Sequence, residues 1–135
     1  MRVLAYGDIM DGGISVFNSV ARIDGAKLIL SFNGVIRIDN PYRHLEGFLR
    51  ELEDIVSKEK IDEVEFDFNE LNFCNSNGFY VIMDITELII NKIQGPIVVK
   101  RSKDDDWQQE TLPILLNTDE SEICERTTFQ DLAEI

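Results

Sequence analysis

The sequence has few of the residues that build metal sites, disulfide frameworks and nucleophilic triads. Its 135 residues include two cysteines, Cys74 and Cys124, and a single histidine, His44. Zinc sites draw on several cysteines and histidines at short spacing, and small disulfide-rich folds need several cysteine pairs. We therefore expect two reduced thiols, no bound metal, no cofactor and no catalysis by a triad that depends on His44.

Basic residues are scarce as well. Lys and Arg number 13 against 26 Asp and Glu, which gives a net charge of −13. A charge of this size repels phosphate backbones and anionic lipid headgroups. The excess is concentrated in residues 102–135, where ten acids face two basic residues, Lys103 and Arg126. The composition therefore predicts neither nucleic acid nor a membrane surface as a partner.

Long hydrophobic runs are also missing, and the first residues do not combine a basic start with an apolar stretch. A membrane-spanning helix needs roughly 18 or more apolar residues in a row. We expect a cytoplasmic protein with one domain over residues 1–135, because this length suits a single core. Residues 1–13 are expected to form either a poorly ordered segment or an additional strand.

Apolar spacing predicts an alternation of strands and helices after an initial hairpin. Strands are expected at residues 14–23, 27–32, 35–38, 64–68 and 97–100, and helices over 42–56, 76–93 and the segment after 106. At the C-terminus we expect a strand at 123–126 and a short helix from Phe129. Parallel strands require crossover connections. The predicted fold is therefore α/β, a mixed sheet of four to six strands with helices packed mainly on one face.

Residues 64–93 carry the most informative local pattern. An alternating strand leads into residues 75–79, Asn-Ser-Asn-Gly-Phe, which are followed by a helix dense in apolar residues. A polar cluster at a strand-to-helix junction gathers hydroxyls and backbone N–H groups at a helix N-terminus, where anions are stabilised. An ordinary helix cap explains the same pattern, with Asn75 or Ser76 as the N-cap and Gly78 allowing close packing on the sheet.

This arrangement resembles the STAS family, the domain shared by anti-sigma-factor antagonists and the tails of sulfate transporters. Members of that family have a strand, a turn of the type Asp-Ser-Ser/Thr-Gly-Leu and then a helix. Residues 75–79 occupy the place of that turn, with Asn75 where the family has Asp and Asn77 where it has the second Ser or Thr. Residues 33–38 occupy the place of the family's turn after an early strand, and the order of elements agrees over most of the chain.

The resemblance implies a regulator of transcription that acts by reversible protein binding and is not an enzyme. Ser76 stands where a partner kinase phosphorylates the antagonists of this family. The implied partners are an ATP-dependent serine kinase of the anti-sigma type and a serine phosphatase, and a homodimer stays open. The implied partner-binding residues are those of the motif turn and of the loop that follows the early strand: Asn75, Asn77, Gly78, Phe79, Tyr80, Gly34, Arg37 and Asp39.

Aromatic residues near this turn are expected to have different surroundings. Phe79 falls on the apolar stripe of the predicted helix, so we expect Tyr80 to be the exposed one of the pair. Aromatic side chains contribute strongly to protein interfaces when they are exposed. Trp107 stands at the start of a later helix, and we expect it to pack against the sheet edge.

Two other functions stay open. One is a STAS-type module that is never phosphorylated, a scaffold or a sensor that holds a small ligand at the helix N-terminus. The other is a small enzyme that uses the carboxylates of residues 62–70, which the alternation places on an exposed strand face. Residues 62–91 include seven acids and no Lys or Arg. We therefore expect a basic or neutral partner surface and binding that weakens as salt rises.

Overall fold

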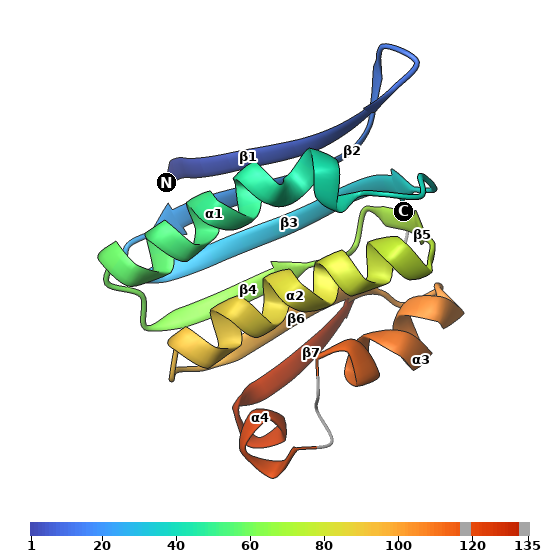
Figure 1. The fold of residues 1–135 in the computed structure, drawn as a ribbon. Coiled ribbons are helices and arrows are strands. Elements are labelled where there is room, and N and C mark those ends of the chain that lie inside the picture. Colours follow the sequence, from blue (N-terminus) through green and yellow to red (C-terminus); the bar gives the residue numbers. More distant parts are fainter. Residues whose placement is uncertain (117–119, 133–135) are drawn as a thin grey trace.

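Strands and helices alternate along the chain in the computed structural model, which describes residues 1–116 and 120–132 (Figure 1). The elements are β1 (Arg2–Asp11), β2 (Ile14–Asp24), β3 (Lys27–Ile36), α1 (Tyr42–Lys58), β4 (Glu63–Asp67), β5 (Leu71–Cys74), α2 (Ser76–Lys92), β6 (Ile97–Ser102), α3 (Asp106–Leu115), α4 (Ser121–Arg126) and β7 (Thr127–Leu132). The α/β class predicted from the sequence is confirmed.

All the strands belong to one mixed sheet, in the order β1-β2-β3-β4-β6-β7. The strands β1, β2 and β3 form an antiparallel meander, and β3, β4, β6 and β7 pair in parallel. The short β5 pairs in parallel with the C-terminal end of β3. The described residues thus form a seven-stranded sheet, larger than the four to six strands expected, because β1 and β5 both add to it.

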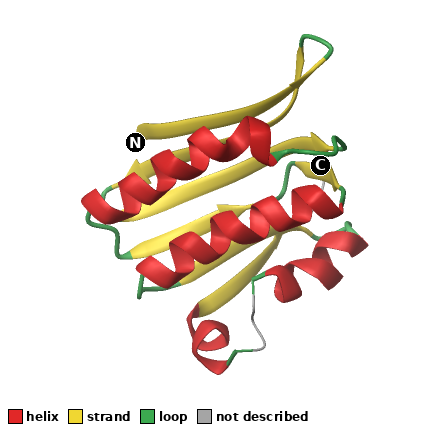
Figure 2. Cartoon of the chain, in the orientation of Figure 1, coloured by secondary structure: helices red, strands yellow, loops and turns green. Residues whose placement is uncertain are grey.

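The helices α1 and α2 lie side by side on one face of the sheet (Figure 2). Strand alternation points one set of side chains at these helices, and the rings of Phe32 and Phe68 stack there with centroids 4.7 Å apart. Burying each large apolar side chain contributes about 1.5–3 kcal/mol. Although α2 is rich in apolar residues, no helix in the described ranges is long and apolar enough to cross a membrane.

The C-terminal elements differ from the expected ones. Residues 121–126 form a helix, although a strand was predicted at 123–126, and residues 127–132 form a strand, although a helix was predicted from Phe129. The open edge of β6 explains the strand, because its backbone groups need partners and Thr127 to Leu132 supply them. Arg126 also donates hydrogen bonds to the backbone oxygens of Ile93 and Gly95. Residues 133–135 of the expected helix lie outside the described residues.

Candidate functional site

The turn between β5 and α2 is held by the side chain of Asn75. Its Oδ1 accepts a hydrogen bond from the backbone nitrogen of Gly78 at 2.9 Å, which makes Asn75 the N-cap of α2. Its Nδ2 donates to the backbone oxygen of Ile38 at 3.0 Å, and its backbone nitrogen donates to that of Ile36. An ionised aspartate has no hydrogen to donate. Asn75 therefore caps the helix and also fastens it to the segment after β3.

Two further contacts join that segment to the turn. The Nδ2 of Asn77 donates to the backbone oxygen of Asp39 at 2.8 Å. The guanidinium carbon of Arg37 lies 4.9 Å from the centroid of the Phe73 ring, within the range of a cation–π contact. The side chains of Arg37 and Asp39 are exposed. The structure thus brings the exposed loop of residues 37–40 against the motif turn.

Gly34 lies within β3 rather than in this loop. It adopts a φ of 102°, and a Cβ there would come within 2.2 Å of the backbone oxygen of Val16. Its backbone nitrogen donates to the oxygen of Glu70 at 2.9 Å. Only glycine fits such a crowded, left-handed position without strain. Gly34 was expected at the start of the loop that ends at Asp39, but it lies inside β3, and the loop begins after Ile36.

Gly78 lets α2 approach the sheet closely. A Cβ at this position would lie 2.7 Å from both the Sγ of Cys74 and the Cγ2 of Ile36. The Cys74 side chain is buried here, and this burial raises the pKa of its thiol to about 12. The thiol is therefore neutral at physiological pH and packs as a small apolar group.

Ser76 is the first residue of α2 and is exposed. It lines a surface pocket of about 200 Å³ together with Cys74, Asn75, Phe79, Tyr80 and Trp107. Tyr80 is 55% exposed, and Phe79 is partly buried, which agrees with the environments expected for the two rings. Their rings meet edge to face with centroids 6.2 Å apart. The hydroxyl of Ser76 thus stands beside an aromatic surface.

A second pocket of about 240 Å³ adjoins the first. It shares Cys74 and Trp107 with the first pocket and is completed by Asn72, Phe73 and Asp105. We call the two pockets together the Trp107 groove. The sequence predicted that Trp107 packs at the sheet edge, but it did not predict the two pockets beside it. The available signal was topological, because the C-terminal ends of parallel strands such as β5 and β6 lie at the same edge of a sheet.

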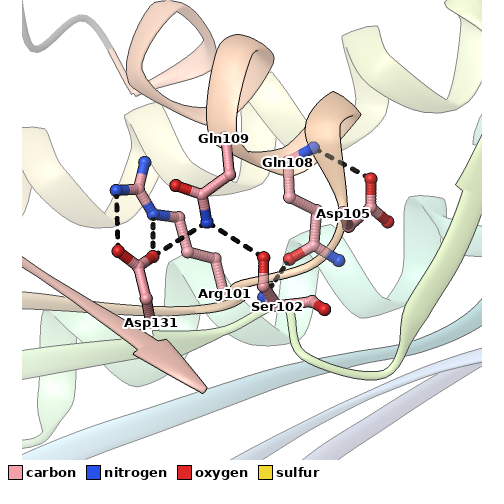
Figure 3. A network of polar contacts seen from close by, with 6 residues as sticks. All are labelled: Arg101, Ser102, Asp105, Gln108, Gln109 and Asp131. Carbon is pink, nitrogen blue, oxygen red and sulfur yellow. Dashed lines mark hydrogen bonds and ion pairs between the residues drawn. The ribbon is translucent and has the colours of Figure 1, made fainter. Parts of the chain in front are cut away.

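The helix that carries Trp107 is anchored by the buried side chain of Gln108, which is 1% exposed (Figure 3). Its Nε2 donates to the backbone oxygens of Phe68 and Leu71 at 2.8 and 3.0 Å. Its Oε1 accepts from the backbone nitrogen of Ser102 at 2.7 Å. One amide thus satisfies three buried backbone groups, and these bonds tie α3 to the last residue of β6, to the residue after β4 and to the first residue of β5.

A more exposed pair completes the network in Figure 3. Arg101 forms an ion pair with Asp131, and Gln109 donates to the same carboxylate and to the backbone oxygen of Ser102. The hydrogen bonds from Arg101 and Gln109 hold the pKa of Asp131 below its usual value. These contacts join the start of α3 to β6 and β7.

Among the acidic residues 62–70, which were expected on an exposed strand face, Glu65 is buried. Glu65 is 6% exposed and lies between Lys27 at 3.2 Å and Lys100 at 3.5 Å, on the two neighbouring strands. The carboxylate of Glu65 is therefore paired with two ammonium groups, as a buried charge requires. In the ranges that the structure describes, no three His, Cys, Asp or Glu side chains gather as metal ligands.

Comparison with known proteins rests on structure. The sequence matches neither a known protein family nor a curated protein. Apo-SiaC from Pseudomonas aeruginosa matches with a TM-score of 0.58 and 19% identity, over 95% of this chain and 98% of SiaC. A second structure of SiaC from Pseudomonas aeruginosa matches with a TM-score of 0.55 and 20% identity, over 86% and 90%.

The anti-sigma factor antagonist SpoIIAA in its unphosphorylated form matches with a TM-score of 0.53 and 9% identity, over 84% of this chain and 88% of SpoIIAA. The chain has a STAS-like fold. This finding confirms the fold that the motif turn and the element order predicted. Within this STAS-like fold, the turn that carries Ser76 lies at the start of the buried helix α2, next to the loop of residues 37–40.

Proposed function

We propose that the chain is a regulatory protein of the anti-sigma factor antagonist type, whose binding to other proteins is switched by phosphorylation of Ser76. The STAS-like fold shared with SpoIIAA and SiaC supports a regulatory role. In this proposal the chain is the substrate of a kinase and has no enzymatic activity of its own. The switch operates in the cytoplasm, where ATP supplies the phosphoryl group, and its output is transcription.

The exposure of Ser76 on a turn that other residues hold together is the observation that carries the proposal. The side chains of Asn75 and Asn77 make the hydrogen bonds that fix the turn. Phosphorylation adds a charge of roughly −1.5 to −2 at pH 7, and a helix N-terminus stabilises an anion. The phosphorylated chain is therefore expected to stay folded while its surface changes.

The change acts on partner binding. A protein that packs over Ser76 would have to desolvate the phosphate, which is costly without a matching cation. The unmodified form is therefore proposed to bind an ATP-dependent serine kinase of the anti-sigma type, and a serine phosphatase restores that form. The exposed loop of residues 37–40 and the motif turn with Tyr80 form the proposed contact surface.

Intact-mass measurement after incubation with the cognate kinase and ATP tests the proposal. Wild type is expected to gain one phosphoryl group, and Ser76→Ala is expected to gain none. Ser121→Ala is the matched control, because Ser121 is also an exposed first residue of a helix. A phosphate that persists in Ser76→Ala would refute the assignment. A wild-type chain that binds the kinase without being modified would favour the non-phosphorylated binding module.

A further inference from the structure

Apart from Ile114, the exposed large hydrophobic side chains of the described residues fall into two groups. One group is on the hairpin of β1 and β2, and the other is beside Ser76. There, Phe73 and Tyr80 are 43% and 55% exposed, and each lines one of the two pockets of the Trp107 groove. Exposed aromatic rings beside small pockets are typical of the residues that contribute most to protein interfaces.

The walls of the groove are held in place before anything binds. Gln108 fastens the start of α3 to the backbone of Phe68 and Leu71. The ring of Tyr80 rests edge to face on Phe79, and Arg37 lies over the ring of Phe73. A groove whose side chains are already ordered loses little conformational entropy when it binds a ligand.

The end of the groove at α3 is acidic. Asp105 lines the larger pocket, and Asp104 and Asp106 flank it in the sequence. The carboxylate of Asp105 is positioned because it caps α3, accepting a hydrogen bond from the backbone nitrogen of Gln108. None of the described residues that line the two pockets is Lys or Arg. The carboxylate of Asp105 can therefore pair with an ammonium or guanidinium group.

The groove is divided into two small pockets. Their volumes are about 200 and 240 Å³. Each pocket has room for one side chain of a bound segment. The two pockets meet at Cys74 and Trp107, so neighbouring side chains of one segment can fill both.

We propose that the Trp107 groove binds a segment of the partner protein in which an aliphatic or aromatic side chain is adjacent to a lysine or arginine. The apolar side chain fills the pocket between Tyr80 and Trp107, and the cation reaches Asp105. This inference rests on the proposed function, because the groove opens beside Ser76 and a phosphate there would border the bound segment. The groove thus links partner recognition to the state of Ser76.

Selection of peptides tests the proposal without a known partner. A random peptide library displayed on phage is selected against the unmodified, immobilised full chain, and enriched peptides are synthesised. Enriched sequences are expected to combine an apolar residue with a nearby Lys or Arg. Their binding is expected to change the fluorescence of Trp107, which is the only tryptophan in the chain.

Three variants assign the binding to the groove. Tyr80→Ala is expected to weaken peptide binding about tenfold. Asp105→Asn keeps a side chain that caps α3 but removes the charge, and we expect about threefold weaker binding with less dependence on salt. Ile114→Ala is the control. It changes a 71% exposed position of α3, and the variant should bind the peptides as wild type does. Circular dichroism verifies that each variant is folded.

Three results would overturn the assignment: no enrichment, enriched peptides without basic residues, or binding that Tyr80→Ala leaves unchanged. The selection uses no kinase, so its failure would leave the phosphorylation of Ser76 intact as a proposal. Conversely, peptides that bind the groove of a chain that no kinase modifies would support the groove and refute the proposed switch.

Discussion

The side-chain nitrogen of Asn75 donates a hydrogen bond to the backbone oxygen of Ile38 at 3.0 Å, across the junction between two separate segments of the chain. The same side chain caps α2 through its oxygen. An amide performs both tasks because it carries a donor and an acceptor, whereas a carboxylate carries acceptors alone. Asn75 therefore couples the Ser76 turn to the loop of residues 37–40.

Replacing Asn75 separates its two tasks. Asn75→Ala is expected to lower the free energy of unfolding by about 2 kcal/mol, because it removes the helix cap and one further hydrogen bond. Asn75→Asp retains a capping oxygen and should cost less. Urea denaturation measures both, with Asn72→Ala at an exposed neighbouring position as the control. An Asn75→Asp chain at least as stable as wild type would mean that the bond to Ile38 contributes nothing.

Two helical glycines should respond to alanine in opposite directions. Gly47→Ala in α1 adds a Cβ with no atom within 4 Å, and it should stabilise the protein by about 0.5–1 kcal/mol. Gly78→Ala drives a Cβ against Cys74 and Ile36, and overpacking of this kind costs about 1–3 kcal/mol. Thermal and urea unfolding compare the two variants. Equal effects would contradict the close approach of α2 to the sheet.

Gln108 and Gln109 are adjacent but should differ in importance. Gln108→Ala leaves buried backbone groups of Phe68, Leu71 and Ser102 without their partner and is expected to cost about 2–4 kcal/mol. Gln109→Ala removes bonds near the surface and should cost less than about 1 kcal/mol. Denaturant unfolding measures the free energy of unfolding of the two single variants. Similar decreases in the two variants would show that Gln108 does not anchor α3.

The ionisation of Tyr42 makes the free energy of unfolding depend on pH in the alkaline range. Burial, and next the hydrogen bond to Asp84, raise the pKa of Tyr42 from 10.0 to about 12. The folded chain thus holds the phenolic proton more tightly than the unfolded chain does. The resulting stability is complete below pH 10.0 and is lost as the pH rises towards about 12.

Replacing Tyr42 by phenylalanine isolates this effect. Tyr42→Phe should lose less stability than wild type does between about pH 9 and about pH 11, because it has no phenol there to ionise. Urea unfolding at the two pH values measures the difference. Identical losses in the two proteins would contradict the raised pKa.

An aspartate at position 76 imitates part of the charge of a phosphate. Ser76→Asp should change the free energy of unfolding by less than about 0.5 kcal/mol, since the position is exposed and the helix N-terminus favours an anion. Its binding to the cognate kinase should nevertheless be weaker than that of Ser76→Ala. Calorimetric titration and thermal melting test the two parts. An unfolded Ser76→Asp chain would indicate a structural role for Ser76.

Local patterns were sufficient to predict the main elements. The alternation in residues 64–68 and the apolar density of 76–93 predicted β4 and α2 with small errors at their ends. The strand predicted at 123–126 and the helix predicted from Phe129 were wrong, because a short segment such as Ile123 and its neighbours is compatible with either structure. Pairing with β6, rather than local preference, determined that β7 begins at Thr127.

The sequence by itself determined the class of fold, the likeness to STAS domains and the place of Ser76 at the start of a buried helix. These features follow from periodicity and capping, which involve residues close together in the chain. Only the tertiary structure decided that Arg37 lies over Phe73, that Glu65 is enclosed by two lysines and that Trp107 stands beside Ser76. Which side chains become neighbours depends on which strands pair and on the edge of the sheet at which the strand ends meet. A local sequence pattern contains no information about either.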